Sequence, residues 1–99
     1  MIIHTTSFVF KEDRPAGSAE SLKTELREQI AGFPGLVAYY NGDNLGIRAG
    51  AADFGVCAVF DSVENLQNYL EHPGHKEIVA RWADSVIASR QTVQFDSEK

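Results

Sequence analysis

Cysteine is almost absent from this sequence: Cys57 is the only one among 99 residues. A single cysteine cannot form an internal disulfide, so the chain lacks the framework typical of small secreted proteins. The segment Met1–Ser7 also lacks the positive region and the long apolar stretch of a signal peptide. Together these features predict a cytoplasmic protein.

Long hydrophobic runs and an excess of basic residues are missing too. No segment approaches the roughly 20 consecutive apolar residues that cross a bilayer, which argues against a membrane protein. The net charge is −5, and no run of Lys or Arg offsets it. Because an acidic surface repels phosphate backbones, this composition argues against a nucleic-acid partner.

The remaining composition is that of a globular protein, with 43% hydrophobic and 23% charged residues. The length predicts one domain over residues 1–99. A chain this short buries only about 60–70% of the surface that its unfolded form exposes. Association with a second copy would therefore add much to its stability.

Alternating and apolar patterns predict four strands, at Ile2–Phe10, Leu36–Tyr40, Phe54–Phe60 and Gln91–Phe95. The glycine-containing segment Asn41–Ala52 leads from one predicted strand into another. We interpret it as a long hairpin connection, because a phosphate-binding loop would lead directly into a helix.

Helical spacing predicts a first helix that Ser18 caps and that Pro34-Gly35 ends. Its apolar stripe consists of Leu22, Leu26, Ile30 and Phe33, and Lys23 belongs to its solvated side.

A second helix is expected after Asp61, which together with Glu64 resembles a capping box. Pro73 breaks it, and a further helical stretch runs from about Gly74 to Ala88.

The resulting order is β, α, β, β, α, α, β. It matches a ferredoxin-like split βαβ fold of the α+β class, in which a four-stranded antiparallel sheet carries its helices on one face. The central strand Phe54–Phe60 is apolar on both sides, with Val56 and Ala58 opposite Cys57 and Val59. A sheet with one face in water should alternate apolar and polar residues. The pattern therefore predicts a homodimer in which a second copy covers the other face.

Four segments, in order, carry a resemblance to a known family. They are Ile3–Lys11, Phe33–Leu36, Leu70–His75 with its His-Pro-Gly-His run, and Val93–Asp96. Taken together they resemble the stress-responsive A/B barrel (Dabb) family. The resemblance implies a dimeric α/β barrel, formed by two sheets, with a cleft between the sheet and the helices of each monomer.

Many members of this family have no assigned activity and are known as stress-induced proteins, whereas some plant members are polyketide cyclases. In the cyclases a Tyr and a His flank the cleft as a proton-transfer pair, and the matching positions here are Tyr69 and His75. The cyclases also carry a His in the third strand, where this sequence has Phe54-Gly55. That departure weakens the prediction of cyclase activity.

His75 and Tyr69 are the predicted catalytic residues. An imidazole titrates near neutral pH and exchanges protons readily, and a phenol can donate to a substrate carbonyl. The structural alternatives are that His75 packs the second helical segment and that Tyr69 belongs to the core.

The predicted ligand-binding residues are His4, Thr6, Phe8 and His72. The first three share one face of the first strand, where they would line a mostly apolar cleft suited to a flat, partly apolar ligand, aromatic or polyketide-like. The structural alternatives are that His4 is a buried, hydrogen-bonded histidine and that His72 finishes its helix. Cys57 is expected to be a small buried hydrophobic residue.

No metal or cofactor is predicted, because His4, His72 and His75 lack the spacing of zinc helices. Three functions stay open at this point. They are a small-molecule-binding dimer without catalysis, a cofactor-independent acid–base enzyme, and a monooxygenase of the related antibiotic-biosynthesis type.

Overall fold

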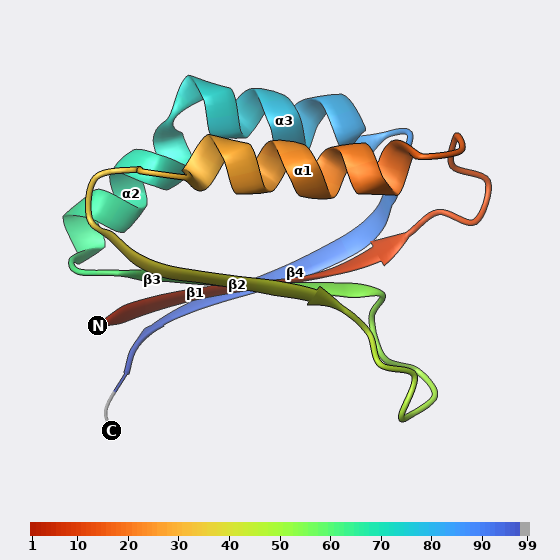
Figure 1. The fold of residues 1–99 in the computed structure, drawn as a ribbon, viewed down its shortest axis with the longest axis horizontal. Coiled ribbons are helices and arrows are strands. Elements are labelled where there is room, and N and C mark those ends of the chain that lie inside the picture. The colour runs from red at the N-terminus through yellow and green to blue at the C-terminus, as the bar shows by residue number, and fades with distance from the viewer. Residues whose placement is uncertain (98–99) are drawn as a thin grey trace.

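A computed structural model describes residues 1–97 of the chain. Its element order is β1 (Ile2–Phe10), α1 (Ser18–Ile30), β2 (Leu36–Asp43), β3 (Phe54–Phe60), α2 (Val63–Glu71), α3 (Pro73–Ala83) and β4 (Ile87–Asp96). The strands form one antiparallel sheet in the order β2-β3-β1-β4. The helices lie on one side of this sheet (Figure 1), so the predicted ferredoxin-like fold is confirmed. Within residues 1–97, no helix has the length and apolar character needed to cross a membrane.

The bounds predicted for β1 and β3 agree with the structure, whereas those of the outer strands were too short. The strand β2 continues to Asp43, and β4 begins at Ile87. The predicted helix through Ala88 was wrong, because α3 ends at Ala83. Val86 and Ile87 are buried as their spacing suggested, but they lie in the turn after α3 and at the start of β4.

Three predicted helix boundaries also need correction. Gly17, with a φ of 76°, occupies the N-cap position of α1 in place of Ser18, which is the first residue of the helix. Ser62 caps α2 in place of Asp61, since its hydroxyl accepts the Asn65 N–H at 3.1 Å. The helix α1 ends at Ile30, before Pro34-Gly35, because the chain turns at Gly32 with a φ of 71°.

Lys23 was assigned to the solvated side of α1, but its side chain is only 17% exposed. The ammonium group bridges Glu20 at 3.0 Å and Asp43 at 2.7 Å, which ties α1 to the end of β2. It also lies over the rings of Phe10 and Phe54. The aliphatic stem of a lysine can cover apolar surface in this way while its charge stays paired.

The opposite face of the sheet carries no helix within the described chain (Figure 1). The strand register brings Tyr40, Cys57, Thr5 and Val93 into one row across this open face, and Ala38, Val59, Ile3 and Phe95 into the next. Val93 and Phe95 are 54% and 48% exposed. Cys57 is only half-buried, so the prediction of a small buried hydrophobic residue was wrong for the single chain. A contiguous apolar surface of this kind marks an interaction site.

Candidate functional site

The side chains between the sheet and the helices form two separate apolar clusters. One gathers around Phe8, Phe10 and Phe54, and the other around Phe60 and Tyr69. On their helix-facing side, the middle parts of β1 and β3 carry smaller or polar side chains, namely His4, Thr6, Val56, which packs against the first cluster, and Ala58, which belongs to the second. Since these residues do not fill the space beneath α1 and α3, a cavity separates the two clusters.

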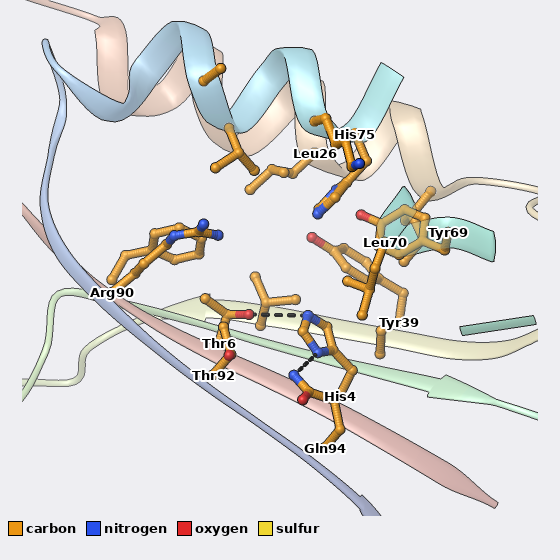
Figure 2. A pocket seen from close by; sticks show the side chains of 17 residues that line it. His4, Thr6, Leu26, Tyr39, Tyr69, Leu70, His75, Arg90, Thr92 and Gln94 are labelled. Carbon is orange, nitrogen blue, oxygen red and sulfur yellow. Dashed lines mark hydrogen bonds between the residues drawn. The ribbon is translucent and has the colours of Figure 1, made fainter. Parts of the chain in front are cut away.

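This cavity has a volume of about 690 Å³, within the range of small-molecule sites. The sequence predicted that five of its residues would share one site: His4, Thr6, Phe8, Tyr69 and His75. Further lining residues are Leu26, Ile30, Tyr39, Val56, Ala58, Leu70, Lys76, Val79, Ala80, Arg90, Thr92 and Gln94. Figure 2 shows that the polar ends of His75, Tyr69 and Tyr39 turn into the same space.

His75 and Tyr69 are brought together because Pro73 separates α2 from α3. Tyr69 lies in the last turn of α2, and His75 lies in the first turn of α3. Their ring centroids are 4.4 Å apart, with an interplanar angle of 46°. The Nδ1 atom of His75 is buried and has no hydrogen-bond partner within residues 1–97. A buried polar atom without a partner is costly, and the side chain that carries this one lines the cavity.

The protonation states of these groups follow from their burial. Burial, with smaller contributions from His4, Arg90 and His72, lowers the pKa of His75 to about 4. Its imidazole is therefore neutral at pH 7 and can accept a proton. Burial raises the pKa of Tyr39 to about 12. Burial and the neighbouring Tyr39 raise the pKa of Tyr69 as well, so both phenols keep their protons and remain donors.

His4 is held in place by hydrogen bonds on both ring nitrogens. Its Nδ1 atom lies 2.8 Å from Nε2 of Gln94, and its Nε2 atom lies 3.3 Å from the hydroxyl of Thr6. An amide nitrogen only donates, so His4 accepts from Gln94 through Nδ1 and carries its proton on Nε2. Burial, and then the charge of Arg90, lower the pKa of this side chain. His4 is thus a neutral, oriented part of the cavity wall.

His72, the remaining predicted ligand-binding residue, does not line the cavity. It ends α2 and caps α3, where its Nδ1 accepts the N–H of Gly74 at 3.0 Å. The three histidines therefore have different positions: His4 and His75 line the cavity, and His72 caps α3. Within residues 1–97, no group of three or more His, Cys, Asp or Glu side chains is arranged to hold a metal ion.

The contribution of the edge strands to the site was not predicted from the sequence. The strand β4 adds Arg90, Thr92 and Gln94 to the cavity wall, and β2 adds Tyr39. On β4 the polar residues at 90, 92 and 94 alternate with Val93 and Phe95 on the open face. This alternation in the sequence could have indicated a polar cavity wall, because a strand that packs only against the core would point its apolar residues toward the helices.

Comparisons with known proteins agree with this architecture. One solved structure is that of a dimeric ferredoxin-like protein of unknown function from Thermobifida fusca. The two chains are 32% identical, with a TM-score of 0.84, over 97% of this chain and 90% of that one. A hydroxynitrile lyase from Passiflora edulis gives a TM-score of 0.86 at 14% identity, over 99% and 94% of the two chains.

A putative antibiotic biosynthesis monooxygenase from Deinococcus radiodurans gives a TM-score of 0.80 at 15% identity, over 100% of this chain and 94% of that one. The last two likenesses concern the fold alone. A comparison with curated proteins finds no significant match. Residues 2–98 match the profile of the stress responsive A/B barrel domain, known as Dabb. The chain therefore belongs to the stress responsive A/B barrel domain family.

Proposed function

We propose that this chain forms a homodimer and that each subunit binds a small, flat, partly apolar carbonyl compound, on which His75 transfers a proton while Tyr69 donates a hydrogen bond to the carbonyl oxygen. The observation that carries the proposal is the contact between the His75 and Tyr69 rings, whose centroids lie 4.4 Å apart and which both line the cavity. Acid–base catalysis requires such groups to converge on one ligand.

The chemistry follows from the protonation states. The neutral His75 takes a proton from the carbon next to the ligand carbonyl, and the electron pair of the broken C–H bond moves into the enolate. The hydroxyl of Tyr69 donates a hydrogen bond to the oxygen on which negative charge develops. Return of the proton from His75 to a carbon of the ligand completes the cycle. Every step uses groups of this chain, so the proposal includes no cofactor.

The homodimer accounts for the open face of the sheet. Its two apolar rows, with Val93 and Phe95 about half exposed, are typical of a surface that a second copy covers. The cavity lies on the opposite side of the sheet, beneath the helices. Dimerisation through the open face would therefore leave each cavity accessible.

A second candidate function is binding without turnover. In the third strand, Phe54 packs against the rings of Phe8 and Phe10, and Gly55 faces the open side of the sheet. Neither residue gives the cavity the additional polar group that the cyclases of this family carry there. A monooxygenase of the antibiotic-biosynthesis type is a third candidate, supported only by fold likeness.

A binding experiment with aromatic ketones tests whether the cavity takes such a ligand. 2-Tetralone is expected to raise the thermal midpoint of the wild type. It should stabilise Tyr69→Phe less, because losing a hydrogen bond of about 1 kcal/mol weakens binding about fivefold. Differential scanning fluorimetry over a ligand titration measures both effects.

The matched controls are Tyr40→Phe, which removes a hydroxyl on the open face, on the side of the sheet away from the cavity, and His72→Asn, which replaces an imidazole outside the cavity. Both should respond to the ketone as the wild type does. Equal stabilisation of wild type, Tyr69→Phe and His75→Gln would show that these residues do not contact the ligand. A loss of several degrees by His75→Gln without ligand, and no change in binding, would favour the structural interpretation of His75.

A further inference from the structure

The charge of the cavity wall is opposite to that of the protein. The chain has a net charge of −5, yet none of the cavity-lining residues is Asp or Glu, and the two charged ones are Lys76 and Arg90. Lys76 is already paired, with Nζ 2.7 Å from the carboxylate of Glu71. Arg90 makes no salt bridge within residues 1–97. The cavity wall therefore carries one positive charge, that of the exposed Arg90, with which no carboxylate of the described chain pairs.

The strand register fixes where this charge lies. Arg90 pairs with Phe8, and Gln94 pairs with His4, so Arg90 stands four residues further along the sheet than the His4–Gln94 pair. At about 3.3 Å per residue this separation is about 13 Å. Figure 2 shows Arg90 on one side of the cavity and His75 with Tyr69 on the other. The charge of Arg90 also contributes to the lowered pKa values of His4 and His75, which indicates that its field reaches into the cavity.

Apolar surface connects the two ends. Leu26 from α1, Val79 from α3 and Val56 from β3 all line the same cavity. A ligand that spans the site would thus meet a cation at one end, apolar side chains in the middle, and a proton donor with a neutral base at the other end. The chemical groups of such a ligand should follow the same order along its length.

We propose that Arg90 is the specificity-determining residue of this cavity and binds a carboxylate, so that the ligand class is a flat, partly apolar keto acid. The guanidinium group matches a carboxylate through two parallel hydrogen bonds. Thr92, next to Arg90 on the same side of β4, adds a hydroxyl that can donate to the same anion. One uncompensated cation balances a monoanion, which favours a carboxylate over a phosphate dianion.

This inference rests on the proposed small-molecule cavity and specifies its ligand. It is tested with two probes of equal shape, 2-naphthoate and the neutral 2-naphthamide, by isothermal titration calorimetry on the full chain. The wild type should bind the acid about tenfold or more tightly than the amide, as expected for a charge-assisted pair. Arg90→Gln should lose this preference while its affinity for the amide stays within about twofold.

The matched control is Arg48→Gln, which removes the same charge from an exposed arginine outside the cavity lining. It should keep the preference for the acid. Equal binding of acid and amide by the wild type would overturn the assignment of Arg90 and leave the cavity itself supported. The same loss in Arg48→Gln would attribute the preference to net charge and overturn the assignment too. Tighter binding of 2-naphthyl phosphate than of 2-naphthoate would overturn the carboxylate class. Binding of neither probe at millimolar concentration would overturn this inference, and the titration with 2-tetralone then decides separately whether the cavity takes a ketone.

Discussion

His75→Gln is expected to slow the exchange of the C1 protons of 2-tetralone for deuterium by about 100-fold, the lower end of what a positioned general base contributes. Glutamine keeps a polar side chain on α3 but has no basic nitrogen. The buried imidazole next to Tyr69 is the group that accepts the proton in our account. Proton NMR of the ketone in deuterated buffer measures the rate directly.

The pH dependence identifies the base. A base is active when deprotonated, so the wild-type rate should be level from pH 7 down to about pH 5 and fall as pH approaches the His75 pKa of about 4. A histidine with an ordinary pKa of about 6.5 would lose about eightfold between pH 7 and pH 5.5. Tyr69→Phe should keep this profile at a rate lowered by about 100-fold, the loss typical of one oxyanion donor. Unchanged rates in both variants would refute the acid–base proposal.

Cys57→Asp is expected to abolish dimerisation or folding. Cys57 is half-buried on the open face, between Tyr40 and Thr5 in the sheet register. In the proposed dimer this position is covered, and burial of an unpaired carboxylate costs several kcal/mol. That cost is comparable to the whole stability of a small domain, about 5–15 kcal/mol. Light scattering after size exclusion should show twice the chain mass for the wild type and less for the variant.

The control for this experiment is Gln67→Glu, which adds the same charge on the exposed side of α2. It should elute as the wild type does. A wild-type protein that is monomeric at micromolar concentration would contradict the interpretation of the open face, as would a Cys57→Asp variant that remains a stable dimer.

The inner strands were predictable because each is a continuous run rich in β-branched and aromatic residues, whereas the ends of the helices were not. Val86 and Ile87 have the spacing of a helical stripe and are indeed buried, yet the chain has already left α3 at Ala83. Burial alone does not distinguish a last helical turn from a loop that enters a strand. Similarly, Asp61 and Ser62 are both good capping residues, and the structure selects Ser62.

The candidate site was predictable in its centre and not at its edges. His4, Thr6 and Phe8 share one face of a regular strand, so their convergence could be predicted from period-two alternation. Tyr39 could not be placed in this way, because the register shifts between Leu36 and Ala38. Leu36 and Tyr39 consequently both contribute to the helix-side cluster around Phe60. A bulge of this kind leaves no clear mark in a sequence.

Arg90 was missed for a different reason. The final strand was predicted to start at Gln91, which left Arg90 outside it, although β4 begins at Ile87. Edge strands tolerate polar residues on both faces, so the sequence pattern only weakly indicates where β4 begins and ends. Once the strand is extended, its alternation places Arg90 on the side of the cavity.

A crystal structure of the protein with 2-tetralone would show directly whether this cavity binds a carbonyl compound between His75 and Tyr69. We expect the ketone in the cavity, with its oxygen within about 2.6–3.2 Å of the Tyr69 hydroxyl and its C1 atom facing a ring nitrogen of His75. A cavity filled by side chains, or a ketone bound only elsewhere such as on the open face, would contradict the proposed binding of the ketone between His75 and Tyr69.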